Sequence, residues 1–402
     1  MSLLPVEDAI AAILGRVPAP TGERVGLAEA NGRVLFEPLI ASHNQPPFNA
    51  SAMDGYAVRA GDMAPGKSFS VIGVSQAGAG FSGSVGAGQC VRIFTGAPVP
   101  EGADAVIMQE EAEARDGAAT FSSRPPVGRS IRPIGNDFAT GRQLMAAGDV
   151  LGPYSLALAA AANKAEIVAS RRPRIAVLAT GDELQLPGQP LGPDEIVASN
   201  NFGLVPMFAP YAQEVLDLGI ARDDRVTLRA KLVEAFDRGI DMLVTTGGAS
   251  VGDHDIVQEV LKDIGVELDF WRINMRPGKP LMFGTRGSTL VFGLPGNPVS
   301  AMVTAALFIK PALRQWLGMK MAVPTPMRLP LAGPTPPNSS RRHFMRARLV
   351  SGSVGMAVEP ISQTDSGHTS SLAQADVLIF QPENDPGQPV GTVVDCVRLD
   401  AF

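Results

Sequence analysis

The chain is 402 residues long, 45% of them hydrophobic and 18% charged, and its formal net charge is -6 at pH 7. This length exceeds what one hydrophobic core usually holds, so several domains are expected. The acidic balance excludes the basic surface of a typical nucleic-acid-binding protein, and an anionic substrate would have to be held by a local basic patch.

The first residues, MSLLPVEDAIAAILG, predict an amphipathic helix and lack the basic start and small-residue cleavage site of a signal peptide. The longest charge-free apolar stretch, LGPYSLALAAAAN, is far shorter than the roughly 20 residues that span a bilayer. We therefore expect a soluble, cytoplasmic protein with no membrane segment. Cys90 and Cys396 lie far apart, which excludes a disulfide framework and a cysteine-rich metal site.

The first part of the chain mixes helical and β patterns. Residues 1–45 predict a helix, a short strand and a connection. Between about 66 and 123, short apolar runs divided by glycines predict an all-β segment, and we interpret residues 46–137 as a β domain inserted into the first domain. Residues 138–172 return to the first domain and include a second helix.

From residue 173 to 322 buried apolar strands alternate with helices, which are expected near 201–212, 226–239, 256–265 and 299–308, the last directly after the Leu-Pro-Gly-Asn-Pro corner. This alternation predicts a doubly wound, mostly parallel α/β sheet. Residues 323–402 return to short strands with Pro and Gly turns, which predict a small β-barrel or sandwich. The expected fold class is multidomain, combining one α/β domain with β domains.

Three strands of the α/β segment end in loops with unusual residues. Residues 180–183 follow the strand IAVLAT, residues 247–255 follow MLVTT, and residues 295–298 follow TLVFGL. In an open α/β sheet, ligands bind beyond the carboxyl ends of the strands, so we expect these loops to form a binding site.

The middle loop, GGASVGDHD, is the most informative of the three. Its glycines let backbone N–H groups approach a ligand, and a helix N-terminus follows, which attracts phosphate. Asp253 and Asp255 would repel a phosphate unless a cation lay between them, so the loop suggests a Mg²⁺-bridged, nucleotide-like ligand. In the alternative interpretation, Gly247 and Gly248 form a tight turn and Asp253 caps a helix.

Arg276 and Lys279 lie three residues apart around a stiff Pro-Gly turn, which suits an oxyanion or a phosphate, although a solvated charged turn is the alternative. The stretch GAGFSG fits a dinucleotide-binding pattern, but no helix follows it, so that match is a coincidence. None of the four histidines pairs with another at metal-ligand spacing.

Six motifs occur in order along nearly the whole chain: FNASAMDGYAV, VRIFTGAPVPEGADAVIMQEE, ATGDEL, TTGGASVGDHD, RPGKP and FGLPGNPVSA. In this order they resemble the molybdopterin molybdenumtransferases, the molybdenum insertase family to which the E domain of gephyrin is related. The resemblance implies four domains with the boundaries above. Residues 173–322 would bind molybdopterin, and residues 1–45 with 138–172 would form an elongated α+β dimerisation domain. The cleft of the implied homodimer lies between the α/β domain and the inserted domain of the partner subunit.

The implied reaction transfers molybdenum from molybdate to adenylylated molybdopterin and releases AMP, with Mg²⁺ or a similar divalent ion. The implied partners are the molybdopterin adenylyltransferase and molybdoenzyme-maturation proteins. The alternative is a non-catalytic molybdopterin-binding or scaffold protein of the same fold. Carboxylates at Asp54, Glu183 and Asp255 favour catalysis, because pterin binding alone would not need them.

The resemblance implies catalytic roles for Asp54, Thr95, Glu183, Asp224 and Asp255. The implied metal ligands are Asp137, Glu183, Asp224 and Asp255. The expected ligand-binding residues are Gly247, Gly248, Ser250, Gly252, Arg276, Lys279, Pro295, Gly296, Asn297 and Pro298. Two positions depart from the family pattern. Arg276 stands where the family has the first lysine of KPGKP, which changes a point charge to a planar fork, and Asn136 stands where an acidic residue is usual.

Overall fold

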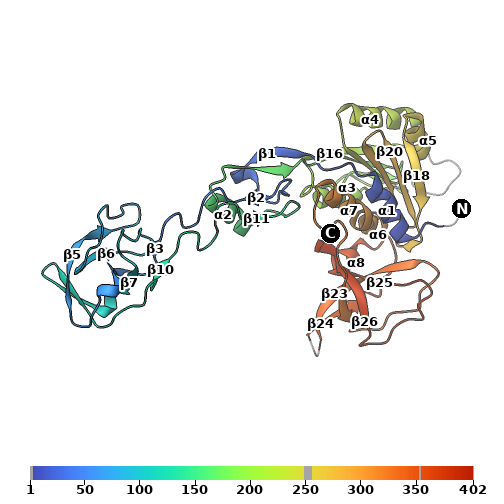
Figure 1. Cartoon of the computed structure of the whole chain (residues 1–402). Helices are drawn as coiled ribbons and strands as arrows, with labels where there is room; N and C mark the ends of the chain where they lie inside the picture. Colours follow the sequence, from blue (N-terminus) through green and yellow to red (C-terminus); the bar gives the residue numbers. More distant parts are fainter. Residues whose placement is uncertain (1–2, 249–255, 353–354, 402) are drawn as a thin grey trace.

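In the computed structural model, which describes residues 3–248, 256–352 and 355–401, the chain is elongated (Figure 1). A β sheet built from the inserted segment lies at one end, a narrow segment follows, and the α/β and C-terminal sheets lie together at the other end (Figure 1). Both cavities described below belong to that second end.

The α/β domain is built on a six-stranded mixed sheet. Its strand order is β16 (Glu214–Ala221), β13 (Arg174–Thr180), β17 (Met242–Thr246), β21 (Thr289–Leu294), β20 (Pro280–Arg286) and β18 (Glu267–Arg272). The four strands from β16 to β21 pair in parallel, whereas β20 is antiparallel to both of its neighbours. The predicted doubly wound, mostly parallel sheet is confirmed. Strand β18 was not predicted, and its half-exposed alternation fits an edge strand.

Helices cover both faces of this sheet. Successive side chains of a strand point to opposite faces, so neighbouring residues of one strand pack against different helices. The helices are α3 (Asn200–Phe208), α4 (Arg225–Asp237), α5 (Ile256–Asp263), α6 (Pro298–Thr304) and α7 (Lys310–Trp316). Ile175 and Val177 pack with α3, α6 and α7, whereas Ala176 and Leu178 pack with α4 and α5. With both faces covered, a ligand reaches the sheet only at its edges or at the ends of its strands.

Helix α1 (Val6–Arg16) packs on the α/β domain rather than on the rest of the N-terminal segment (Figure 1). Its buried residues Val6, Ala9 and Ile13 belong to the same core as α7. Arg16 adds an ion pair with Asp269 of β18 at 2.8 Å. The sequence predicts the helix and its apolar face but not the surface that this face covers.

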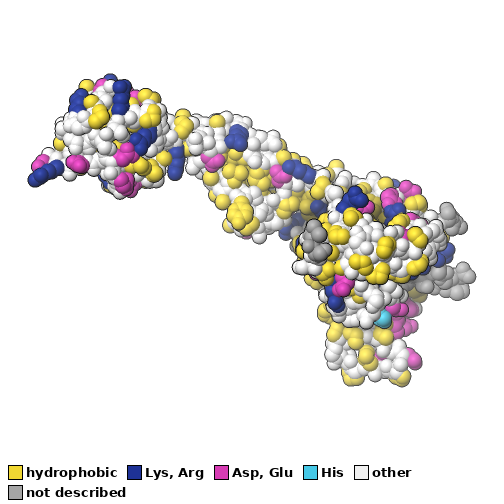
Figure 2. All heavy atoms as spheres, turned by 90° about the horizontal axis from the view of Figure 1, so that it is seen from below, with side chains coloured by type: hydrophobic (Ala, Val, Ile, Leu, Met, Phe, Trp, Pro, Cys, Tyr) yellow, Lys and Arg dark blue, Asp and Glu magenta, His cyan; other side chains and the backbone are white. Residues whose placement is uncertain are grey.

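The middle of the molecule consists of two short strand pairs and one helix. Strand β1 (Gly22–Gly26) pairs with β12 (Glu166–Ser170), β2 (Leu39–Ile40) pairs with β11 (Gln143–Met145), and α2 is Pro153–Ala161. Figure 2 shows hydrophobic side chains gathered over this segment. Its exposed large apolar residues are Phe36, Ile40, Val150 and Tyr154.

The inserted domain confirms the predicted all-β segment. Its sheet has the order β7 (Ala105–Met108), β4 (Gly55–Val58), β6 (Gln89–Ile93), β5 (Ser68–Ser75), β9 (Ala118–Phe121) and β8 (Ala112–Arg115). A short pair, β3 (Ala50–Ser51) with β10 (Ile131–Arg132), lies at its base, where the chain enters and leaves.

The C-terminal domain is a small β-barrel, one of the two alternatives that the sequence predicts. Its strands are β22 (Met327–Pro330), β23 (Arg342–Gly352), β24 (Gly355–Pro360), β25 (Val377–Gln381) and β26 (Val393–Arg398), with the short helix α8 (Thr369–Ala373). A bridge between Leu331 and Val358 brings the two ends of the sheet together. One strand comes from the α/β domain: β19 (Met275–Arg276) pairs in parallel with β23. This shared sheet joins the two domains beside the cavities.

Candidate active site

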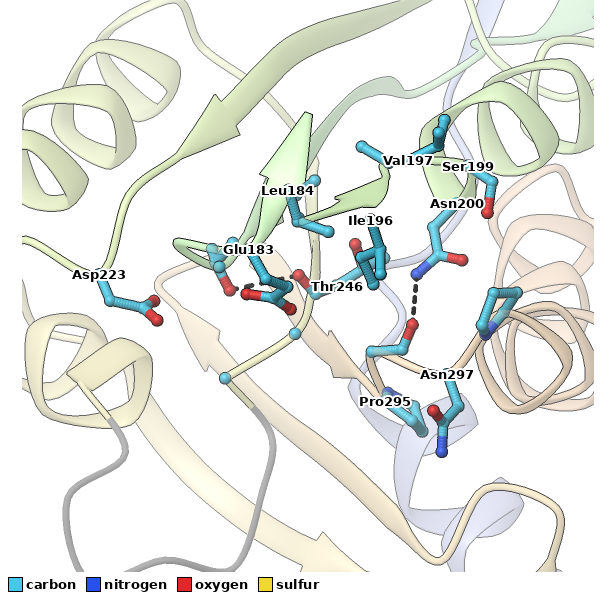
Figure 3. A pocket seen from close by; sticks show the side chains of 18 of the residues that line it. Glu183, Leu184, Ile196, Val197, Ser199, Asn200, Asp223, Thr246, Pro295 and Asn297 are labelled. Atoms are coloured by element: carbon cyan, nitrogen blue, oxygen red, sulfur yellow. Dashed lines mark hydrogen bonds between the residues drawn. The ribbon is translucent and has the colours of Figure 1, made fainter. Parts of the chain in front are cut away.

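A cavity of about 680 Å³, here called the large cavity, lies at the carboxyl ends of β13, β17 and β21. The three strands end in register, with Thr246 opposite both Ala179 and Leu294. The loops that follow line the cavity with residues 179–181, 183, 246–248 and 295–298. The convergence that the sequence predicts for these loops is therefore present in the described residues (Figure 3).

The start of the middle loop needs glycine for a steric reason. Gly247 has a φ of 85°, and a Cβ there would collide with the carbonyl oxygen of Thr180. The hydroxyl of Thr180 in turn donates to the carbonyl oxygen of Thr246 over 3.2 Å. Only a residue without a side chain lets the β13 and β17 loops approach this closely.

Carboxylates gather at one side of the large cavity, where Figure 3 shows Glu183 and Asp223. A carboxylate oxygen of Asp182 accepts from the backbone N–H of Asp223 at 3.0 Å and ties the β13 loop to the β16 loop. Burial raises the pKa of Asp223, and the charges of Asp182 and Glu183 raise it further. Like charges that crowd in this way provide a place for a cation.

Asp224, for which the resemblance implies catalytic and metal-binding roles, lies at the N-terminus of helix α4. Its side chain caps helix α4, accepting from the backbone N–H of Thr227 at 2.8 Å, and hydrogen bonds from the side chain and the backbone of Thr227 lower the pKa of Asp224. It is not among the residues that line the large cavity, whereas its neighbour Asp223 is. In the motif ARDD the two aspartates are adjacent, so sequence spacing alone could not separate the helix cap from the cavity residue.

Asn200 lies opposite the carboxylates and was not predicted as a site residue (Figure 3). Its side-chain Nδ2 donates to the carbonyl oxygen of Gly296 at 2.8 Å, which ties the start of α3 to the Leu-Pro-Gly-Asn-Pro corner. The only sequence signal was an Asn-Asn pair at the start of a predicted helix, which is also typical of an ordinary helix cap.

The Leu-Pro-Gly-Asn-Pro corner is the strand-to-helix turn that the sequence predicts, and Pro298 is the first residue of α6. The side-chain Nδ2 of Asn297 donates to Ser366 Oγ at 3.1 Å, and the backbone N–H of Val299 donates to the carbonyl oxygen of Ser366 at 3.1 Å. The C-terminal domain therefore holds this corner from outside the sheet.

A second cavity of about 270 Å³, here called the cationic cavity, adjoins the first, and Pro280 and Asn297 line both. Its remaining lining residues are Arg276, Pro277, Gly278, Lys279, Ser300, Arg341, His343, Thr364 and Ser366. The α/β and C-terminal domains both contribute to it. Arg276 and Lys279 do converge here, as the sequence predicts.

Two observations at Arg276 fit an anion in the cationic cavity. Burial and the positive charge of Arg341 lower the pKa of Arg276. The Nε atom of Arg276 is buried and has no hydrogen-bond partner. A tetrahedral oxyanion would accept from this free donor and would relieve the repulsion between the two guanidinium groups.

The structure does not bring every predicted residue to these cavities. Asp54 and Thr95 lie on the inserted domain, where Asp54 Oδ1 accepts from the backbone N–H and hydroxyl of Thr95 at 2.7 and 2.8 Å. These hydrogen bonds lower the pKa of Asp54. Asp137 is exposed next to Phe138, whose bridge to Gln45 lies where the inserted domain meets the middle segment. In Figure 1 the inserted domain lies at the opposite end of the molecule from the α/β and C-terminal domains, which line the cavities.

The predicted residues Ser250, Gly252 and Asp255 lie outside the described residues. Within residues 3–248, 256–352 and 355–401, no group of three or more His, Cys, Asp or Glu side chains is arranged to hold a metal ion. Glu183 and Asp223 are therefore an incomplete ligand set in this part of the chain. None of the helices in the same described ranges combines the length and apolar character needed to span a bilayer.

The fold and the two cavities define a class: multidomain α/β proteins with a cavity at the carboxyl ends of the parallel strands and a cluster of positive side chains beside it. Family models match most of the chain: residues 4–163 match the MoeA N-terminal region (domain I and II), 176–315 a probable molybdopterin binding domain, and 328–399 the MoeA C-terminal region (domain IV).

The chain is 39% identical to the molybdopterin molybdenumtransferase of Haemophilus influenzae over 320 residues, 79% of each chain. It is 31% identical to that of Staphylococcus aureus over 410 residues, 99% of this chain and 96% of the relative. The crystal structure of the molybdopterin biosynthesis MoeA protein from Pyrococcus horikoshii matches it with a TM-score of 0.86 at 30% identity, over 99% of both chains. The chain belongs to the molybdopterin molybdenumtransferase family.

The steric role of Gly247 predicts the effect of adding one methyl group. Gly265 is a matched control, because its φ of 88° is similar but a Cβ there would meet nothing within 4 Å. Gly265→Ala should lower the free energy of unfolding by about 1 kcal/mol, from backbone strain alone. Gly247→Ala should lower it further, because the Cβ would also collide with Thr180. Thermal unfolding measures both values, and equal losses would contradict the close approach of the two loops.

Proposed function

We propose that the protein is a molybdopterin molybdenumtransferase that transfers molybdenum from molybdate to adenylylated molybdopterin and releases AMP. The observation that carries this proposal is the pair of adjoining cavities, which share Pro280 and Asn297. One cavity is large and the other is small and cationic. Two anionic reactants of unequal size would lie side by side in them, on a chain whose relatives are named for this activity.

The large cavity suits the pterin nucleotide in size and lining. Apolar residues Leu184, Ile196 and Val197 line part of it, and the strand-end loops together with the polar residues Glu183, Asn200 and Asp223 line much of the rest. Its volume of about 680 Å³ is within the range of small-molecule sites. Asn200 would hold the wall formed by Gly296 in place, since its hydrogen bond fixes that carbonyl oxygen.

The cationic cavity suits the oxyanion. Arg276, Lys279 and Arg341 supply positive charge from two domains, and the hydroxyls of Ser300, Thr364 and Ser366 supply neutral donors. Positive groups fixed before the oxyanion arrives cost little reorganisation when charge moves during the reaction. We assign molybdate to this cavity and the pterin nucleotide to the other.

A divalent cation, Mg²⁺ in our proposal, would be held at the carboxylate side of the large cavity. Glu183 and Asp223 are its best ligands within the described residues, because both carboxylates line the cavity. Burial, and then the charges of Asp182 and Glu183, raise the pKa of Asp223, and a bound cation would offset this cost. Asp255 would complete the set, and Asp224 takes the role of helix cap instead. When bound, the cation would neutralise phosphate charge as AMP leaves.

We further propose that a second copy of the chain completes the site. Asp54 precedes β4 and Thr95 follows β6, and hydrogen bonds between them join these two loops of the inserted domain, at the far end of the molecule from both cavities (Figure 1). A homodimer would let these loops reach the cleft of the partner subunit. The exposed apolar residues of the middle segment, in the parts 1–45 and 138–172, offer a surface for that contact (Figure 2).

Each domain and two kinds of partner protein would have a part in this reaction. Residues 46–137 would act as the inserted arm, residues 173–322 as the molybdopterin-binding domain and residues 323–402 as its C-terminal support. A molybdopterin adenylyltransferase would supply the substrate and molybdoenzyme-maturation proteins would accept the product. The protein would meet both kinds of partner in the cytoplasm.

A single-turnover measurement tests the function directly. Protein, adenylylated molybdopterin, molybdate and Mg²⁺ are mixed, and AMP is followed by chromatography. AMP release should require protein and molybdate together, and chelation of Mg²⁺ should slow it. Release that is independent of molybdate would contradict the transferase assignment. Tight pterin binding without any release would instead support a scaffold.

The adjacent aspartates of the ARDD motif provide a matched pair of variants. Asp223→Asn should slow AMP release by about tenfold or more, because it removes one charge beside the proposed cation. Asp224→Asn should leave the rate nearly unchanged, because asparagine caps a helix as well as aspartate does. The same single-turnover measurement checks both, and the reverse order of effects would assign the site to Asp224.

Mixed dimers test whether the site is shared between two copies. Asp54→Ala and Glu183→Ala chains should each be inactive alone. Mixed and allowed to exchange, they should regain about a quarter of wild-type activity, since half of the dimers then hold one intact site of two. A mixture that stays inactive while exchange is verified by mass would place each complete site within a single chain.

A further inference from the structure

Arg276 and His343 are directly opposite each other in the sheet that joins the α/β and C-terminal domains. Strand β19 pairs in parallel with β23, and Arg276 is the register partner of His343. Both side chains line the cationic cavity. His343 is only 4% exposed, so its ring is fixed by its surroundings.

The contact with Arg276 assigns the protonated ring nitrogen of His343. Arg276 NH2 lies 3.0 Å from His343 Nδ1, and a guanidinium can only donate, so in this contact Nδ1 accepts and the proton is on Nε2. Gln381 Oε1 lies 3.2 Å from the same nitrogen, but an amide oxygen can only accept, so it makes no hydrogen bond with an unprotonated Nδ1. Gln381 is held in this orientation because its Nε2 donates to the carbonyl oxygen of Pro336 at 2.6 Å.

The surroundings of the ring keep it uncharged. Burial lowers the pKa of His343 to about 4, and the positive charges of Arg276, Arg346 and Arg341 contribute to the shift. The remaining neighbour, Gln381, is uncharged and raises the pKa, because its amide oxygen would accept from a protonated Nδ1. A neutral ring remains an acceptor for Arg276 throughout the neutral pH range.

The contact with His343 uses one terminal nitrogen of Arg276 and leaves the N–H groups of Nε and NH1 without a hydrogen-bond partner among the described residues. Nε is also buried. An arginine fork held at one terminal nitrogen keeps a fixed plane, so its remaining N–H groups point in a fixed direction. A lysine at this position would have a single ammonium and no such plane.

We propose that His343 is a positioning residue: its neutral imidazole holds the Arg276 guanidinium as an oriented donor to the oxyanion in the cationic cavity. This role rests on the proposed function, because it deepens the assignment of that cavity to molybdate. It also gives the departure of Arg276 from the family's lysine a structural reason, since the arginine has a dedicated acceptor on the neighbouring strand.

Oxyanion binding by the whole protein tests the proposal, with tungstate and molybdate as probes in calorimetry. His343→Leu removes the acceptor and should weaken binding by about tenfold, the loss expected when a hydrogen bond to a charged group is broken. His343→Asn keeps an acceptor near the position of Nδ1 and should bind within about twofold of wild type. Equal losses in both variants would overturn the proposal.

A double-mutant cycle separates positioning from general damage. In an Arg276→Lys background, His343→Leu should add less than about a twofold further loss, because the group it positions is gone. Additive losses would contradict the role. In turnover, His343→Leu should raise the KM for molybdate and leave the KM for adenylylated molybdopterin unchanged, whereas a merely structural defect would change both.

The ring itself offers a test that needs no variant to fold. With only four histidines in the chain, ¹⁵N-labelled histidine should give a resolvable spectrum. At neutral pH, His343 should show an unprotonated Nδ1 and a protonated Nε2, and a protonated Nδ1 would overturn the proposal. If AMP release proves independent of molybdate, the transferase function fails, but tungstate binding and the tautomer still decide the role of His343.

Discussion

The register of three parallel strands is the constraint on which both cavities depend. Because Ala179, Thr246 and Leu294 lie side by side, the chain leaves the sheet three times at one level. Helices cover both faces, so the loops that follow these residues have only the strand ends as a place to meet. Gly247 then permits an approach between two of the loops that a side chain would prevent. The position of the large cavity follows from backbone pairing, before any polar side chain is considered.

Negative and positive side chains lie apart from each other along the carboxyl ends of these strands. The carboxylates of Glu183 and Asp223 lie at the side of β13 and β16, and Arg276 and Lys279 lie beyond the corner at Pro280 and Asn297. Opposite charges placed apart do not neutralise each other as an ion pair, so each remains available to a ligand. Negative side chains therefore line one of the two adjoining cavities and positive side chains the other, as the proposed reaction between anionic reactants requires.

The joint between the α/β and C-terminal domains is part of the site rather than a passive connection. Strand β19 completes the C-terminal sheet, and Ser366 holds the Asn297 corner through its hydroxyl and its carbonyl oxygen. Arg276 and His343 face each other across this joint. A change in the packing of the C-terminal domain would therefore alter both cavities, even though none of the described residues that line the larger one belongs to that domain.

The sequence by itself determined the domain types, the buried strands of the α/β sheet without the edge strand β18, and the three loops, because hydrophobic periodicity and glycine and proline punctuation are local properties. It also determined that Arg276 and Lys279 converge, since three residues of chain hold them together. Only the tertiary structure decided the rest. It separated Asp223 from Asp224, because a cap and a cavity residue differ in backbone direction and not in residue type. It paired α1 with α7, Asn200 with Gly296 and His343 with Arg276, because partners 67 or more residues apart leave no periodic signal in the chain.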